Sequence, residues 1–340
     1  MVLPDSVREN VAQETTPPMS ADRPLVSVMM PVRNGADTIG AALRSVLSQR
    51  GSVEIVVVND GSTDATRDIV LAFHDDRIVL VDQPPRGVNA ARNTALDHMT
   101  GRWIALLDAD DEWLPGRLDT IFDCLDKRQT ALMADDMLIE RQGRQYSLME
   151  SKGLLAHVEN PVTAAEFTRR DLGLLQPTVR ADLTEGLRFP EHVQKTGDFP
   201  FWFQVVKRAG GLQLWPILGY RHRRNPGSVS AQSPDLWMQS VAATSELLSM
   251  PGLALTGSER SALEMRLRLA WGRYQRSIAQ REWVAGNRSA AVTRVLSRPS
   301  IAVERANSVH DRARVSLVAK GSRRPTVDST LLASNDPRGR

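Results

Sequence analysis

Two carboxylates separated by one residue, Asp108 and Asp110, follow an apolar, β-prone run at residues 103–107. In an extended segment, side chains at positions i and i+2 point to the same side of the chain. Carboxylate oxygens placed in this way suit Mg²⁺ or Mn²⁺, ions that also bind the phosphates of a substrate. On its own an Asp-x-Asp pair is also common in solvated turns, so its context has to decide between the two interpretations.

Two more polar clusters follow apolar, β-prone runs. Arg33 and Asn34 come after residues 25–30, and Asp60 comes after residues 53–58. Asp60 has the chemistry to accept hydrogen bonds from the N–H groups of a ligand. The same turn also predicts a helix cap formed by Ser62 or Asp64, and both roles can coexist.

Arg92 lies in the first turns of a predicted helix at residues 89–99. A helix N-terminus and a guanidinium together favour an anion such as a phosphate. The alternative interpretation is an ordinary surface arginine.

The elements that would position these clusters alternate between strand and helix over about 90 residues. Such alternation predicts a parallel, buried sheet with helices on both faces. Ligands of such sheets bind beyond the C-terminal ends of the strands, where all three clusters fall. We therefore expect one site at this edge. Strands are predicted at 25–30, 53–58, 77–82, 103–107 and 132–134, and helices within 37–47, 66–73, 89–99 and 234–317.

Composition excludes several classes of protein. The 340 residues include 43 Lys and Arg, 40 Asp and Glu and a single cysteine, Cys124, so neither an internal disulfide framework nor a cysteine zinc cluster is possible. The net charge of +3 gives little reason to expect nucleic-acid binding. The charge is unevenly spread, because residues 251–324 carry a net +10 and residues 1–250 a net −7. No apolar run is long enough to span a membrane, and residues 1–23 do not resemble a signal peptide.

Four segments together resemble the family 2 glycosyltransferases, which have the GT-A fold. The segments lie in the order and at the spacing typical of that family, and they are VSVMMPVRNG (26–35), VVNDGSTD (57–64), GVNAARN (87–93) and LLDADD (106–111). The resemblance implies an NDP-sugar donor, in the first place a UDP-sugar, and a Mg²⁺ or Mn²⁺ cofactor. It also implies a glycan acceptor carried on a lipid.

The resemblance further implies roles for individual residues. Pro31, Arg33, Asn34 and Asp60 would hold the nucleoside, and Arg92 would lie beside the nucleotide. Asp108 would reach the ribose and the metal, and Asp110 would bind the metal directly.

Two later segments also match the family. Asp198 aligns with the general base that deprotonates the acceptor, although Gly197 stands where the family usually has Glu. Without the resemblance, Asp198 would be read as a helix N-cap ahead of Pro200. His222, in Tyr220–Arg224, resembles a basic segment near the diphosphate, with a basic surface loop as the alternative.

The sequence therefore predicts an α/β fold of the GT-A type, a mostly parallel sheet with a C-terminal helical extension. The expected divisions are a disordered leader (1–23), a catalytic domain (24–230), a helical region (231–320) and a disordered tail (321–340). We expect a cytoplasmic protein whose basic helices either contact anionic lipid at the inner face of the membrane or dock on the acidic body. Two other functions stay open: a sugar nucleotidyltransferase and a non-catalytic sugar-nucleotide-binding subunit.

Overall fold

The computed structural model describes residues 25–141, 144–194, 196–223 and 234–296. The expected leader at 1–23 and the expected tail at 321–340 lie outside these ranges. Across the described residues, none of the helices combines the length and the apolar character needed to span a bilayer.

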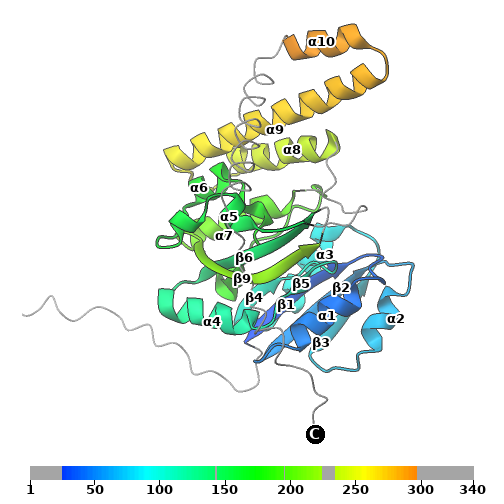
Figure 1. The fold of residues 1–340 in the computed structure, drawn as a ribbon, viewed down its shortest axis with the longest axis vertical. Helices are drawn as coiled ribbons and strands as arrows, with labels where there is room; N and C mark the ends of the chain where they lie inside the picture. The colour runs from blue at the N-terminus through cyan, green and yellow to red at the C-terminus, as the bar shows by residue number, and fades with distance from the viewer. Residues whose placement is uncertain (1–24, 142–143, 195, 224–233, 297–340) are drawn as a thin grey trace, which may run out of the picture.

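The first half of the sheet is parallel and is built from consecutive segments of the chain (Figure 1). Its strands run in the spatial order β3-β2-β1-β4, and all seven residues of β1 are buried. The chain crosses in one direction from β1 to β3 and then returns to β4. Right-handed crossovers therefore place α1 and α2 on one face and α3 on the other. The elements are β1 (Val26–Val32), α1 (Ile39–Leu47), β2 (Val53–Asp60), α2 (Thr66–Leu71), β3 (Ile78–Gln83), α3 (Val88–His98) and β4 (Trp103–Leu106).

The second half of the sheet is mixed. β8 pairs antiparallel with β4 and β6, whereas β6 and β9 run parallel, and β5 at the far edge pairs antiparallel with β9. The predicted α/β fold is confirmed, with parallel pairing throughout the first four strands and mixed pairing beyond them. The elements are β5 (Glu112–Trp113), α4 (Arg117–Arg128), β6 (Leu132–Arg141), β7 (Arg144–Ser147), α5 (Leu148–Ser151), α6 (Ala164–Arg169), β8 (Thr178–Arg180), α7 (Asp198–Arg208) and β9 (Gln213–Arg223).

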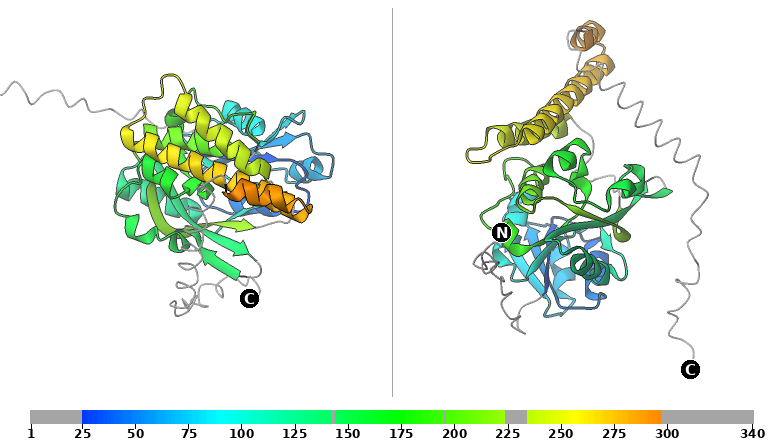
Figure 2. Two further views of the ribbon diagram at one scale, coloured as in Figure 1. Left: turned by 90° about the horizontal axis from the view of Figure 1, so that it is seen from above. Right: turned by 90° about the vertical axis from the view of Figure 1, so that its left-hand side faces the viewer.

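Three helices form a layer above the second half of the sheet: α8 (Pro234–Ser249), α9 (Gly257–Val284) and α10 (Arg288–Leu296) (Figures 1 and 2). A capping box between Thr256 and Glu259 begins α9. Glu259 also forms an ion pair with Lys207 of α7 at 2.8 Å, which joins α9 to the body. The predicted C-terminal helical extension is therefore present as far as Leu296, and the rest of the predicted helical region, to residue 320, lies outside the described residues.

Two details of this region differ from the sequence expectation. The sequence predicts a helix from Trp283 to Leu296, but α9 ends at Val284 and Gly286 turns the chain with a φ of +87°. Steps of three and four residues also predict an apolar helical stripe that docks on the body, made of Leu263, Leu267, Trp271, Tyr274 and Ile278. This stripe is only partly buried: Leu263 is fully buried, but Trp271 is 38% exposed. Most of the contact face of α9 is instead made by small residues and Gln275, which allow close helix approach.

A buried ion pair joins α4 to the strands of the second half of the sheet. The guanidinium of Arg117 in α4 donates to both carboxylate oxygens of Asp135 in β6, at 2.8 and 2.9 Å. It also lies over the rings of Trp113 and Tyr220, 4.5 and 5.1 Å from their centroids. Both charged side chains are almost completely buried. Four separate elements, α4, β5, β6 and β9, therefore meet at one charged group.

Candidate active site

The acidic cluster after β4 is held in place by β9. Asp111 is 2% exposed, and its carboxylate accepts hydrogen bonds from the Tyr220 hydroxyl and the Arg223 N–H, both at 2.8 Å. The Nδ1 atom of His222 lies 3.1 Å from the same carboxylate. The antiparallel pairing of β5 with β9 brings these partners together across more than 100 residues of sequence. His222 thus turns its Nε2 atom away from Asp111.

Three neighbouring carboxylates make this cluster electrostatically strained. Burial raises the pKa of Asp110 to about 6, and the charges of Asp111 and Asp108 add to the shift. Burial alone would lower the pKa of His222, but the hydrogen bond and charge of Asp111 raise it. A bound cation would relieve the repulsion between these carboxylates.

The residues present fit a divalent cation held jointly with a substrate. Within the described ranges, no three His, Cys, Asp or Glu side chains form a ready-made metal cage. Mg²⁺ and Mn²⁺ do not need one, because they are commonly held by one or two carboxylates together with phosphate oxygens and water. Asp108 and Asp110 supply such carboxylates, and the charges of Asp111 and Asp108 add to the effect of burial in raising the pKa of Asp110.

The charge of Arg92 acts on two of the predicted site carboxylates. Its Nη2 atom is 3.3 Å from Asp108, and its positive charge also acts on Asp198. The side chain of Arg92 is 8% exposed and lies over the Phe189 ring, with the guanidinium carbon 5.5 Å from the centroid. This placement excludes the alternative of an ordinary surface arginine.

Asp198 is the first residue of α7 and is half-buried. Gly197 occupies the N-cap position, so Asp198 does not have the capping position of the alternative interpretation. Burial raises the pKa of Asp198, Arg92 opposes that shift, and Asp108 adds to it. Asp198 and the acidic cluster therefore belong to one electrostatic unit.

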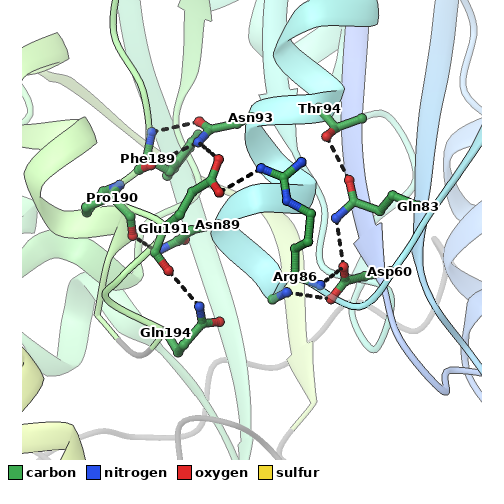
Figure 3. Close-up of polar contacts among 11 residues, drawn as sticks. Asp60, Gln83, Arg86, Asn89, Asn93, Thr94, Phe189, Pro190, Glu191 and Gln194 are labelled. Carbon is green, nitrogen blue, oxygen red and sulfur yellow. Dashed lines mark hydrogen bonds and ion pairs between the residues drawn. The ribbon is translucent and has the colours of Figure 1, made fainter.

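Asp60 lies at the end of β2 and organises the loop that leads into α3 (Figure 3). Its carboxylate accepts hydrogen bonds from the Gln83 amide at 2.7 Å and from the backbone N–H groups of Arg86 and Gly87 at 2.8 Å. Gly87 has a φ of +97°, a conformation that L side chains rarely adopt. Asp60 thereby fixes the start of α3, the helix that carries Arg92. The contact of Asp60 with a nucleoside stays a prediction.

The remaining predicted residues lie at the neighbouring end of β1. Pro31 is buried within the strand, and Arg33 and Asn34 are exposed just after it. Asn34 has a φ of +53°, and its side-chain oxygen accepts a hydrogen bond from the Thr63 N–H at 2.8 Å. The structure thus unites Arg92, Asp108, Asp110, Asp198 and His222 in one cluster, with Pro31, Arg33, Asn34 and Asp60 along the adjoining strand ends.

Two residues of this cluster received no role from the sequence. Asp111 fixes His222, and Tyr220 joins Asp111 to the backbone of Asp108, whose N–H donates to the hydroxyl at 3.3 Å. The signal was present, since Asp111 is a third carboxylate directly after the Asp108–Asp110 pair. Its partners could not be identified, because they lie on a strand 110 residues later.

Comparisons with known proteins agree with the fold and the motifs. The family model described as "Glycosyl transferase family 2" matches residues 27–164. The chain is 41% identical to the UDP-Glc:alpha-D-GlcNAc-diphosphoundecaprenol beta-1,3-glucosyltransferase WfgD of Escherichia coli, over 54% of this chain and 70% of WfgD. It is 30% identical to the succinoglycan biosynthesis protein ExoO of Rhizobium meliloti (strain 1021), over 63% of this chain and 65% of ExoO.

Solved structures show the same fold at low sequence identity. The S. aureus TarS structure in complex with UDP-GlcNAc covers 73% of this chain and 72% of its own, with a TM-score of 0.58 and 20% identity. The mannosyltransferase PcManGT from Pyrobaculum calidifontis, in complex with GDP-Man and Mn²⁺, covers 88% and 85%, with a TM-score of 0.56 and 19% identity. Taken with the four motifs and the relatives above, these matches establish that the chain belongs to glycosyl transferase family 2.

Proposed function

We propose that this protein is an inverting, metal-dependent glycosyltransferase of polysaccharide biosynthesis. It transfers a sugar from a UDP-sugar to a lipid-linked glycan acceptor. The observation that carries the proposal is Arg92, which lies 3.3 Å from Asp108 of the acidic cluster and whose positive charge also acts on Asp198. The Arg92 guanidinium thus links the side of the site that would bind the diphosphate to the side that would accept the proton.

The proposed reaction follows from the chemistry of these groups. The acceptor hydroxyl oxygen forms a bond to the anomeric carbon while the bond from that carbon to the UDP oxygen breaks. The hydroxyl proton goes to the Asp198 carboxylate, and UDP leaves with the bonding electron pair. Because the acceptor attacks the face opposite UDP, the anomeric configuration inverts. Arg92 offsets negative charge beside the diphosphate. Asp110 and Asp108 would hold the cation, which when bound neutralises charge that develops on the leaving diphosphate.

The relatives support the choice of substrates. WfgD is named for UDP-Glc as donor and a diphosphoundecaprenol-linked sugar as acceptor, and ExoO is named for succinoglycan biosynthesis. The TarS structure was solved with UDP-GlcNAc. For this chain, a UDP-sugar and a lipid-linked acceptor are the proposal.

A donor screen tests the proposed reaction. We expect UDP release from one UDP-sugar in the presence of Mn²⁺ or Mg²⁺ and a lipid-linked acceptor extract, and loss of release in EDTA. Asp110→Asn should lower the rate by about 100-fold or more, because the cation loses a charged ligand. Asp119→Asn, which removes an exposed carboxylate of α4, is the matched control and should keep the full rate.

Each result of this screen has a consequence for the proposal. Full activity in EDTA would contradict the metal dependence. Binding of a nucleotide sugar without turnover of any donor would favour the non-catalytic subunit. Release of inorganic diphosphate from a nucleoside triphosphate and a sugar phosphate would favour the nucleotidyltransferase.

The proposal places the protein at the cytoplasmic face of the membrane, with the turn between α9 and α10 against anionic lipid. At this turn Trp283 is 52% exposed and Val284 80% exposed, and Arg281 and Arg288 flank them. The Arg288 guanidinium carbon lies 5.4 Å from the centroid of the Trp283 ring. Tryptophan beside arginine suits the boundary between lipid headgroups and acyl chains. The net positive charge of residues 251–324 also favours anionic lipid.

The lipid contact is tested by sedimentation with vesicles. We expect the wild-type protein to bind phosphatidylglycerol-containing vesicles and to bind phosphatidylcholine vesicles weakly. The double variant Trp283→Ser/Val284→Ser should weaken binding about tenfold, because two apolar side chains no longer enter the interface. Leu155→Ser removes a similarly exposed apolar side chain outside α9 and α10 and should bind as the wild type. Binding that ignores the anionic lipid content would refute this contact and leave the helices as a cap on the body.

A further inference from the structure

The loop that leads to Asp198 is hydrogen-bonded to α3 (Figure 3). Asn93 pairs with the backbone of Phe189 in both directions: its amide donates to the carbonyl at 2.9 Å, and its oxygen accepts from the N–H at 2.8 Å. One turn earlier on the same helix, Asn89 donates to the carbonyl oxygens of Pro190 and Val193. Two asparagines of one rigid helix therefore fix residues 189–193.

Asn89 also belongs to the acidic side of the site. Its side-chain oxygen accepts a hydrogen bond from Arg92 Nη1 at 3.2 Å, and Arg92 Nη2 contacts Asp108 at 3.3 Å. Asn89 is fully buried, so these hydrogen bonds do not compete with water. A continuous series of contacts runs from Asp108 through Arg92 and Asn89 to the loop before Asp198.

Gly197 completes this arrangement. A Cβ atom at position 197 would overlap the side-chain amide of Asn89 and the carbonyl oxygen of Val193. Because the backbone torsions of Gly197 are ordinary, with a φ of −72°, the glycine is required by space. The family's usual Glu is therefore absent for a physical reason, since Asn89 occupies the place where that side chain would begin.

The neighbouring ion pair adds little to this connection. Arg86 and Glu191 are 2.8 Å apart, but their side chains are 53% and 42% exposed. Exposed pairs of this kind contribute little to stability. The buried amide of Asn89 is the stronger connection between α3 and the loop.

We infer that Asn89 is a positioning residue for the transfer reaction, which it serves by holding the loop before Asp198 at a fixed place relative to Arg92 and Asp108. This inference rests on the proposed function and deepens it. Arg92, beside the donor, and the loop before Asp198, the proton acceptor, are thereby both hydrogen-bonded to Asn89. Asn93 holds the start of the same loop.

The test compares nucleotide affinity with turnover. In Asn89→Ala we expect the Kd for UDP to change less than threefold, whereas kcat for transfer falls about 10- to 100-fold, as expected when a reacting group is misplaced. The acid limb of the kcat–pH profile should also move toward lower pH, because greater access of water to Asp198 would lower the pKa that burial raises. Gly197→Ala keeps the asparagine but should lower kcat similarly, because the added Cβ displaces the Asn89 amide and the Val193 carbonyl.

The double variant separates positioning from loss of folding. Asn89→Ala opens room at position 197, so adding Gly197→Ala to it should lower kcat by clearly less than Gly197→Ala does in the wild type. Gln213→Ala is the matched control, since Gln213 is a buried amide that also donates to two backbone carbonyls, of Val158 and Leu214. It should lower thermal stability and keep kcat.

Two results would overturn the inference: unchanged kcat in folded Asn89→Ala, or strictly additive effects in the double variant. Inactivity of the wild type with every donor would instead contradict the proposed function. An active wild type with an unaffected Asn89→Ala contradicts the positioning role alone.

Discussion

Asp198→Asn is expected to lower sugar transfer by about 10³-fold while leaving UDP affinity within threefold of the wild type. General base catalysis contributes about 10²- to 10⁴-fold to a rate, and the amide cannot take the acceptor proton. Since the substitution keeps the size of a half-buried side chain and removes its charge, the fold should persist. UDP release with acceptor present measures the first effect, and calorimetric titration with UDP measures the second.

The pH dependence of the wild-type enzyme supplies an independent check. Burial raises the pKa of Asp198 above its ordinary value of 3.8. The base must be ionised, so activity is present above the raised pKa and is lost as the pH falls through it. Asp110, with a pKa of about 6, titrates in the same direction, but its protonation competes with the metal. Saturating Mn²⁺ should therefore move the loss of activity caused by protonation of Asp110 to lower pH. The loss of activity caused by protonation of Asp198 should stay at the same pH.

Asp126→Asn, which changes an exposed carboxylate of α4, serves as the control for Asp198→Asn and should retain full activity. If Asp198→Asn kept the wild-type rate, Asp198 would not be the base. A rate loss accompanied by an equal loss of UDP affinity would instead place Asp198 in donor binding.

Asp135→Ala is expected to destabilise the protein by about 3–5 kcal/mol, because it leaves the buried charge of Arg117 without its partner. Both side chains are at most 2% exposed, and Arg117 donates to both oxygens of Asp135. The free energy of unfolding in urea, followed by tryptophan fluorescence, measures the effect. Tyr220 packs on Arg117, so the transfer rate should fall together with stability.

Two comparisons make the Asp135 result specific. Arg117→Met/Asp135→Leu removes both charges and should be clearly more stable than Asp135→Ala, since replacing a whole buried pair costs less than breaking it. Asp182→Asn breaks an exposed ion pair, in which the side chains of Arg180 and Asp182 are 44% and 51% exposed. It should lower the free energy of unfolding by less than about 1 kcal/mol. Equal stability of Asp135→Ala and Asp182→Asn would contradict the importance assigned to burial.

Much of the parallel half of the sheet could be predicted from the sequence. Buried parallel strands consist of continuous apolar runs, and such runs match β1, β2 and β4 closely, while the edge strand β3 is also close to its predicted bounds. β6 was predicted only at 132–134, although it extends to Arg141. Asp135 and Asp136 interrupt its apolar pattern, and they can be buried there because Arg117 and Ser147 bind them. Those partners lie elsewhere in the chain, so no local pattern reveals them.

The site was predictable to a similar degree. The family resemblance and the strand ends together indicated Asp108, Asp110 and Arg92, which the structure brings into contact or close proximity. Gly197 was interpreted as the loss of an acidic group, and the reason for it became visible only once Asn89 was placed beside it. The roles of Asp111 and Tyr220 depend on the pairing of β5 with β9, which requires the tertiary fold.

The position of β5 at the far edge of the sheet has a consequence for biosynthesis. Asp111 lies 109 residues before Tyr220, and the described hydrogen-bond partners of its carboxylate, Tyr220, His222 and Arg223, belong to β9. Ribosomes add about 5–20 residues per second, so these partners emerge on the order of ten seconds after the acidic cluster. The strands β1 to β4 pair among themselves and need no later segment to do so. The nascent chain can thus form the parallel half of the sheet, β1 to β4, first. The acidic cluster acquires its final arrangement only when β9 has been synthesised.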